Sequence, residues 1–188
     1  HHGVLFLDEL PEFKRSVLEV LRQPLEDGKV TISRAGTKAT YPSRLMLVSA
    51  MNPCPCGYLS DPTGKCSCSR SQVQKYQSKI SGPLLDRIDL QIEVPRVNFK
   101  ELTSKTRQES SKSIRSRVKQ ARIIQDERFK GSNVWCNALM TNRHLKEFCQ
   151  VTPEGERILE RAVDRLGFSA RACHSAVRVA RTIADLDN

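Results

Sequence analysis

Two adjacent acidic residues, Asp8 and Glu9, directly follow a run of four apolar residues, Val4 to Leu7. A short apolar run bounded by polar residues is typical of a strand buried on both faces of a parallel sheet. In such sheets ligands bind beyond the carboxyl ends of the strands, where both acids would emerge. One carboxylate there can hold the Mg²⁺ of a nucleoside triphosphate, and the next can orient the attacking water. The alternative is a core strand that ends in two solvated acids.

A second strand of the buried type is predicted over residues 44–51, and it ends in Asn52. An amide at the end of a strand beside the first one can position the attacking water or contact the terminal phosphate. The alternative is an asparagine that begins a turn before Pro53, which is common turn chemistry.

Residues 29–41, KVTISRAGTKATY, predict a β-hairpin with Ala35 and Gly36 in its turn. The hairpin region contains no acid and four basic residues, Lys29, Arg34, Lys38 and Arg44. Such a surface suits contact with a phosphate backbone, although a merely solvated hairpin would look the same. The formal net charge of +10 also indicates an anionic partner, most often nucleic acid.

Four cysteines lie as two C-x-C pairs in a loop rich in proline and glycine, residues 53–69. They are Cys54, Cys56, Cys66 and Cys68. Four thiolates suit a tetrahedral zinc ion, which would order a loop without its own core. The spacing differs from the commoner C-x₂-C, so free thiols and a redox switch remain alternatives. Without an export signal, the seven cysteines of the chain indicate reduced thiols and a cytoplasmic protein.

Taken together, these segments resemble the magnesium-chelatase-like AAA+ ATPases of the ComM/YifB type over almost the whole chain. The resemblance rests on GVLFLDELPEF, the basic hairpin, LVSAMNPCPCG and SGPLLDRIDL. It implies that Asp8 and Glu9 are the Walker B pair, with Asp8 at the Mg²⁺ of ATP, and that Asn52 is the sensor-1 residue. It also implies that the hairpin is the pre-sensor hairpin, which faces a central pore.

The resemblance also assigns two arginines. Arg87 matches the arginine finger that reaches the nucleotide of a neighbouring subunit, and a guanidinium can stabilise charge that develops on a phosphate. The alternative is local pairing of Arg87 with Asp86 or Asp89. The segment FSARACHSAVRVARTIADL is similar to the family's carboxyl-terminal signature, so Arg171 would be the sensor-2 arginine. A basic helix end held by a nearby acid is the alternative for Arg171.

The implied fold is α/β. Residues 1–97 would form part of an AAA+ P-loop NTPase core with parallel strands, helices and the hairpin, and residues 98–188 an all-α lid. The alternation of Ile88, Leu90, Ile92 and Val94 with polar residues predicts a further strand. In the lid, apolar residues at helical spacing predict a buried stripe on a helix that begins near Pro153, namely Ile158, Leu159, Ala162, Val163 and Leu166.

No G-x-x-x-x-G-K-[ST] motif occurs in the sequence. We therefore expect the chain to be the carboxyl-terminal part of a longer protein and to hydrolyse ATP negligibly by itself. The leading hypothesis is a part of a hexameric ATPase, with ATP and Mg²⁺ at subunit interfaces, that moves along DNA in branch migration or unwinding. The alternatives are the ATPase subunit of a magnesium chelatase and a non-catalytic, zinc-stabilised DNA-binding fragment. No apolar run approaches the ~20 residues of a membrane span.

Overall fold

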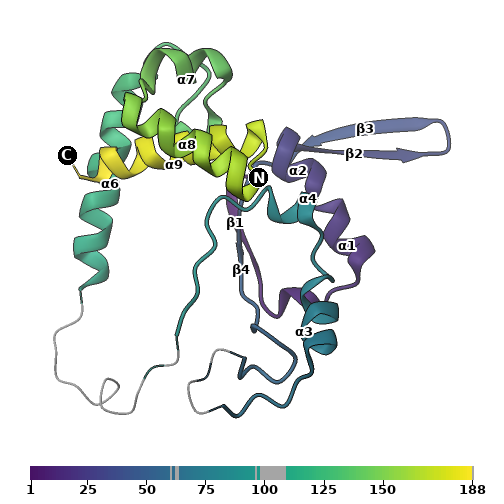
Figure 1. Ribbon diagram of the computed structural model, residues 1–188. Coiled ribbons are helices and arrows are strands. Elements are labelled where there is room, and N and C mark those ends of the chain that lie inside the picture. Colours follow the sequence, from purple (N-terminus) through teal and green to yellow (C-terminus); the bar gives the residue numbers. More distant parts are fainter. Residues whose placement is uncertain (60, 62–63, 96, 98–108, 188) are drawn as a thin grey trace. The chain divides into compact units, whose positions relative to one another are not determined.

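The computed structural model describes residues 1–59, 61, 64–95, 97 and 109–187. The chain divides into two compact units, His1–Leu102 and Thr103–Asn188 (Figure 1). The first unit is mixed α/β and the second is helical, so the α/β class followed by a helical region is confirmed at this coarse level. The two units are described separately.

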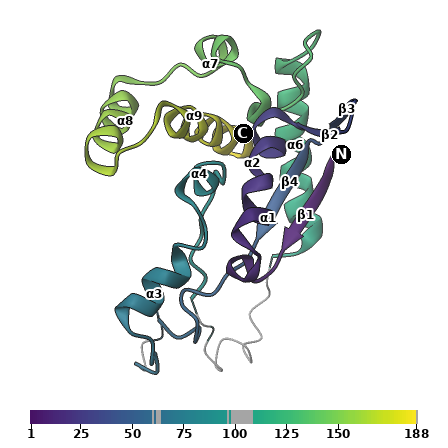
Figure 2. The same cartoon turned by 90° about the vertical axis from the view of Figure 1, so that its right-hand side faces the viewer.

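In the first unit, strands β1 (Gly3–Leu7) and β4 (Leu45–Ser49) form a two-stranded parallel sheet. They lie side by side in Figures 1 and 2, with Gly3 paired to Leu45 and Leu7 to Ser49. Both strands were predicted. Burial on both faces was not correct, because Val4 and Phe6 are exposed. Among the described residues, nothing pairs with the outer edges of this sheet.

Helices on one side of this sheet supply the core of the unit. They are the 3₁₀ helix η1 (Leu10–Glu12), α1 (Arg15–Val20), α2 (Arg22–Asp27), α3 (Arg70–Gln77) and α4 (Gly82–Leu85). The buried side chains of the core are Leu10, Leu18, Ile80 and Leu84. Ser69 begins α3 with a capping box to Gln72, so the end of the cysteine loop is joined to a defined helix start.

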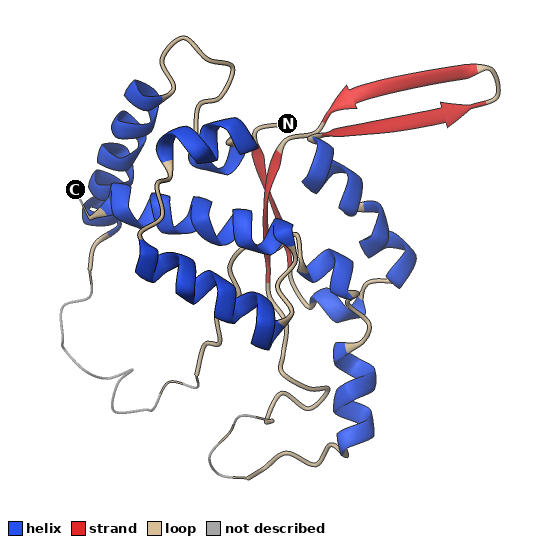
Figure 3. Cartoon of the chain, turned by 45° about the horizontal axis from the view of Figure 1, so that its top comes forward, coloured by secondary structure: helices blue, strands red, loops and turns tan. Residues whose placement is uncertain are grey.

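Strands β2 (Lys29–Arg34) and β3 (Thr37–Pro42) form the predicted antiparallel hairpin. Arg34 pairs with Thr37, which leaves Ala35 and Gly36 as a two-residue turn; Gly36 has a positive φ of 78°. The hairpin, red in Figure 3, projects away from the helices of its unit (Figures 1 and 3).

The strand predicted for residues 88–94 is absent from the described part of the chain. Residues 88–95 have no regular structure, and Ile92 is 80% exposed. The alternating pattern shows which side chains could share a face, but a strand also needs a neighbour that supplies backbone hydrogen bonds. No described segment does so here.

The second unit contains α6 (Ser111–Arg128), the 3₁₀ helix η2 (Asn137–Leu139), α7 (Asn142–Phe148), α8 (Pro153–Leu166) and α9 (Ala170–Leu186). Thr141, Thr152 and Ser169 occupy the amino-terminal caps of the last three helices. Gly167 ends α8 with φ 67°. No described helix is long and apolar enough to span a membrane.

The core of this unit consists of Phe129, Met140 and Leu145, with Val177 of α9 packed against it. The buried stripe predicted for α8 was wrong. Ile158 and Val163 are exposed, and Leu166 is 71% exposed. Helical spacing correctly predicted one apolar face, but of its five residues only Leu159 and Ala162 are half-buried.

A polar network lies beside this core. Asp185 of α9 has 1% exposure and forms two hydrogen bonds with Arg128 of α6. Asn137 of η2 donates to Asp185 at 2.8 Å and accepts from Arg128 at 2.8 Å. The network therefore joins three separate elements of the unit.

Candidate functional site

The predicted acidic pair and the predicted amide emerge at the same edge of the parallel sheet. Asp8 follows β1 directly, and Asn52 lies three residues after β4. Because Leu7 pairs with Ser49 in a parallel register, both strands end at the same level. The two connections remain hydrogen-bonded beyond the strands, from the Ala50 amide to the Leu7 carbonyl and from the Leu10 amide to the Ala50 carbonyl, both at 3.0 Å.

Glu9 has an unusual backbone conformation. Its φ of 50° and ψ of 46° lie in the left-handed region, which costs a non-glycine residue about 1 kcal/mol. Its amide donates to Oδ1 of Asp8 at 2.9 Å, and its carbonyl accepts from the Glu12 amide at 2.8 Å. Strained positions held by their surroundings are concentrated at functional sites. Here the bend at Glu9 turns the chain away from the direction of β1, and both Asp8 and Glu9 are exposed.

Tyr76 of α3 belongs to this site and was not predicted as part of it. Its side chain is buried, and the backbone of Asn52 acts on its hydroxyl group in the direction that lowers the pKa of Tyr76. Burial raises the pKa of Tyr76, and the charges of Glu12 and Glu9 act in the same direction. The sequence showed only that Tyr76 lies on the apolar side of a helix. Its contact with Asn52 depends on how α3 packs.

Arg87 lies just after α4 and pairs with Glu26 of the same chain. Its guanidinium also donates to the carbonyl of Pro83, and its side chain is only 12% exposed. The alternative from the sequence was that Arg87 pairs locally with Asp86 or Asp89. Glu26, its partner in the structure, lies 61 residues from Arg87 in the sequence. In this arrangement the guanidinium is engaged within its own chain. The arginine-finger role stays a prediction, and it requires the pair with Glu26 to open.

The other predicted basic residues are distributed over both units. Alternation along the hairpin places Lys29 and Lys38 on one face and Arg34 on the other, beside the turn. Arg44 lies at the base of the hairpin against Gly28. All four side chains are exposed. Arg171 is half-buried in the first turn of α9, in the second unit, and its sensor-2 role stays a prediction.

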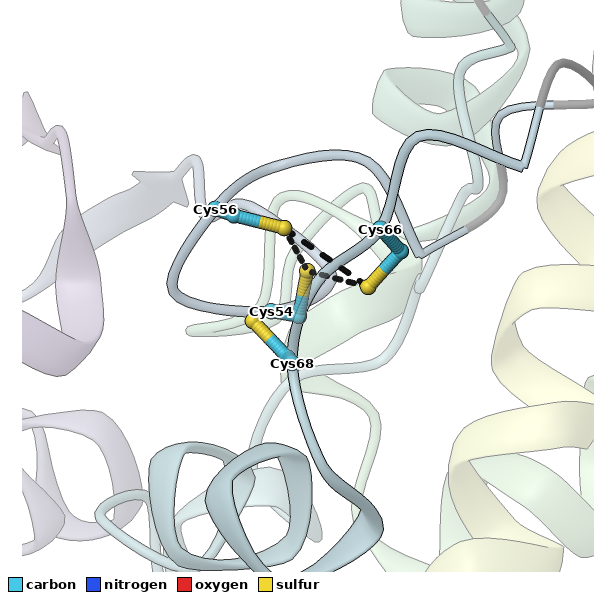
Figure 4. A group of neighbouring side chains, drawn as sticks. All are labelled: Cys54, Cys56, Cys66 and Cys68. Atoms are coloured by element: carbon cyan, nitrogen blue, oxygen red, sulfur yellow. Dashed lines mark hydrogen bonds between the residues drawn. The ribbon is translucent and has the colours of Figure 1, made fainter.

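The four predicted cysteines come together. The ligand atoms of Cys54, Cys56, Cys66 and Cys68 all lie within 4.8 Å of one another (Figure 4). All are free thiols in the structure. Cys54 and Cys56 belong to one limb of the loop and Cys66 and Cys68 to the other, so the cluster holds the two limbs side by side.

The thiols of this cluster differ in acidity. The backbone amide of Tyr58 is the main cause that lowers the pKa of Cys56 to about 6. The backbone amide of Cys56 also lowers the pKa of Cys68, but the Cys56 side chain, burial and Cys54 outweigh it and raise that pKa to about 12. Close thiols therefore do not all ionise together without a positive charge among them.

Comparisons with known proteins match both units. The family "Magnesium chelatase, subunit ChlI" matches residues 1–102, and "Magnesium chelatase, subunit ChlI C-terminal" matches residues 108–188. The competence protein ComM of Haemophilus influenzae is 44% identical over 98% of this chain and 35% of its own length. The uncharacterized protein YifB of Escherichia coli is 42% identical over 100% of this chain and 36% of its own length. The chain thus spans about a third of these relatives.

Proposed function

The chain belongs to the magnesium chelatase subunit ChlI family of ATPases, with relatives of the ComM/YifB type, and we propose that it forms part of an AAA+ ATPase that moves along DNA. The observation that supports the ATPase part most directly is the common edge at which Asp8, Glu9 and Asn52 leave two paired parallel strands. That edge is where α/β proteins bind nucleotides.

The donor chemistry at this edge fits a magnesium nucleotide. Carboxylate oxygens are the ligands that Mg²⁺ prefers, and Asp8 has a second oxygen besides the one that accepts from the Glu9 amide. Mg²⁺, when bound with ATP, neutralises negative charge on the phosphates. Asp8 would hold that ion, Glu9 would orient the attacking water and accept its proton, and the Asn52 amide would fix the water or the terminal phosphate.

Arg87 would complete the site of a neighbouring subunit in a hexameric ring. For this role its pair with Glu26 opens in the assembly, and the guanidinium then contacts the phosphates of the neighbour's ATP. We expect Arg87→Ala in the full-length protein to lower ATP hydrolysis about 10³-fold, in the range of known arginine fingers, with ATP binding retained.

Subunit mixing gives a sharp test of this assignment. Arg87→Ala subunits keep Glu9, and Glu9→Gln subunits keep Arg87, so mixed rings contain some interfaces with both intact groups. We expect the mixture to regain ATPase activity that neither variant has alone. No recovery in rings that demonstrably mix would assign Arg87 to its contact with Glu26 and not to catalysis in a neighbour.

The exposed basic hairpin supports DNA as the partner. Arg34 lies beside the turn and Lys38 one position further along β3, where the hairpin projects from its unit (Figure 1). Each lysine or arginine that neutralises a phosphate makes binding more dependent on salt. A pore-facing hairpin would let these side chains follow the backbone without reading its sequence.

We expect the double change Arg34→Ala and Lys38→Ala in the full-length protein to remove DNA-stimulated ATPase activity while basal hydrolysis is kept. The slope of log affinity against log salt should fall by about 2, roughly 1 for each lost phosphate contact. The double change Arg143→Ala and Lys146→Ala, which removes two exposed charges from α7, is the matched control. Equal effects of both changes would show a general charge effect and remove the hairpin from the DNA interface.

A magnesium-chelatase ATPase subunit is a second candidate, because both family matches carry that name. The hairpin charge and the net charge of +10 favour nucleic acid over it. DNA-stimulated ATPase activity separates the two candidates. A third candidate, a zinc-stabilised DNA-binding fragment without catalysis, would bind DNA with no response to ATP.

A further inference from the structure

We propose that the four clustered cysteines bind one zinc ion, and that this metal fixes the chain segment that carries Asn52. The sulfur geometry is the first support. The Sγ atom of Cys54 lies 3.4 Å from that of Cys56 and 3.8 Å from that of Cys66, and the Cys56–Cys66 distance is 3.6 Å. A tetrahedron with Zn–S distances of about 2.3 Å has sulfur atoms about 3.8 Å apart. Three of the four thiols thus already have the spacing of a four-sulfur zinc shell, and the Sγ atom of Cys68 lies within 4.8 Å of each of them.

The backbone presents the first pair of ligands on a tight turn. The Gly57 amide donates to the Cys54 carbonyl at 3.0 Å, and Gly57 has a positive φ of 79°. This turn brings Cys54 and Cys56 to the same side although only one residue separates them. Cys54 is fully buried, whereas Cys56 and Cys66 are half-buried. The metal would therefore lie at the inner end of the loop.

The loop has no apolar core that could hold it in shape. Among the described residues of the range 53–69, Cys54 is the only buried one. Small segments of this kind obtain their order from a metal, because binding energy replaces the missing core. Four sulfur ligands also leave no open position for water or substrate, which characterises a structural zinc site and not a catalytic one.

The same loop connects directly to Asn52. Cys54 follows Asn52 by two residues, and the Asn52 side chain lies against the turn, since a Cβ at Gly57 would be 3.8 Å from its Oδ1. At the other end, Cys68 immediately precedes Ser69, which caps α3. Helix α3 in turn contacts the start of the loop, because Gln77 donates to the Pro53 carbonyl at 3.1 Å.

These contacts join the Asn52 segment, the cysteine loop and α3 to one another. A zinc ion would link the limb that leaves Asn52 to the limb that enters α3, and α3 returns to the Asn52 segment through Gln77 and Tyr76. Without the metal, only the contacts of α3 would hold the Asn52 segment in place. The role of the metal in positioning Asn52 rests on the proposed ATPase function, whereas the zinc site itself does not.

The test measures zinc in the full-length protein, purified with reductant and without chelator. We expect one zinc per chain by elemental analysis. Cys54→Ser and Cys66→Ser should each lose most of it, and Cys136→Ser, outside the cluster, should keep it. A zinc content near zero in the unaltered protein would overturn the proposal, as would equal zinc in the cluster variants and the control.

Cobalt substitution keeps the proposal testable if a cluster variant fails to fold. Co²⁺ bound to the unaltered protein should show sulfur-to-metal charge-transfer bands and the intense d–d bands of a tetrahedral four-sulfur site. Removal of the metal should increase protease cleavage within residues 53–69. Cobalt spectra of an octahedral site would contradict the four-sulfur site. Unchanged protease cleavage after removal of the metal would contradict its ordering role. Both readouts omit ATP, so a zinc-loaded protein without ATPase activity would refute the proposed function alone.

Discussion

Replacing Glu9 with glutamine in the full-length protein should lower ATP hydrolysis about 10³-fold while ATP binding is kept, an effect on activity as large as the one expected for Arg87→Ala. The amide has nearly the shape of the carboxylate but cannot accept a proton from the attacking water. Loss of a positioned general base lowers rates by 10²–10⁴-fold, so we expect a reduction of about 10³-fold. Asp8 remains in the variant, and therefore the magnesium nucleotide should still bind. Steady-state phosphate release and a nucleotide-binding titration measure the two properties separately.

Glu12→Gln is the matched control for this experiment. Glu12 lies three residues further along, in η1, and its exposed carboxylate pairs with Lys79 at 3.3 Å. Exposed pairs of this kind contribute about 1 kcal/mol or less to stability. We expect Glu12→Gln to keep near-normal hydrolysis. If Glu9→Gln hydrolysed ATP as fast as this control, Glu9 would not be the catalytic carboxylate.

Asp185→Asn should destabilise the second unit by about 3–5 kcal/mol, the largest effect on stability that we expect. Its carboxylate is buried and accepts from Arg128 at 2.7 Å and from Asn137 at 2.8 Å. Arg181, four residues earlier on α9, also pairs with it at 2.9 Å. The change would leave the Arg128 guanidinium, 8% exposed, as a buried charge without a full counter-charge. The expected cost comes mainly from that unpaired charge.

The pH dependence of this unit follows from the same network. Burial alone would raise the pKa of Asp185, but hydrogen bonds from Arg128 and Asn137 outweigh it and lower the pKa from 3.8 to about 2. Because the pKa of Asp185 is lower in the folded chain than in the unfolded chain, its ionised carboxylate stabilises the folded state at pH values above the unfolded pKa. That contribution, about 2 kcal/mol, is complete near neutral pH and is lost as the pH falls from 3.8 toward 2. Asp185→Asn should remove this acid-dependent part of the stability.

Urea unfolding of the chain, followed by fluorescence of its single tryptophan, measures both effects. Trp135 lies two residues before Asn137 and therefore reports on the second unit. Asp187→Asn, at an exposed position of the same helix end, is the control and should change stability by about 0.5 kcal/mol or less. Equal midpoints for the two variants would show that the buried network contributes little.

Features that depend on neighbouring residues were predictable from the sequence. The hairpin turn follows from Ala35–Gly36, because its second residue has a positive φ of 78°, which glycine adopts without strain. The cap at Thr152 and the end of α8 at Gly167 likewise need only local chemistry. The approach of the four cysteines was expected because both C-x-C pairs lie in one short loop, although their spacing also left free thiols and a redox switch open.

Only the tertiary structure decided which surfaces are covered and which distant groups meet. The alternation of residues 88–94 and the apolar face of α8 were read correctly as patterns, but most of their apolar side chains are exposed. Arg87 meets Glu26, and Arg128 meets Asp185, across 61 and 57 residues. Burial and charge pairing depend on two surfaces in contact, whereas a periodic sequence pattern describes only one of the two surfaces. The sequence by itself therefore determined the local elements, among them the two strands that carry Asp8, Glu9 and Asn52, and the loop with the four cysteines. Packing determined the partners of Arg87 and Arg128.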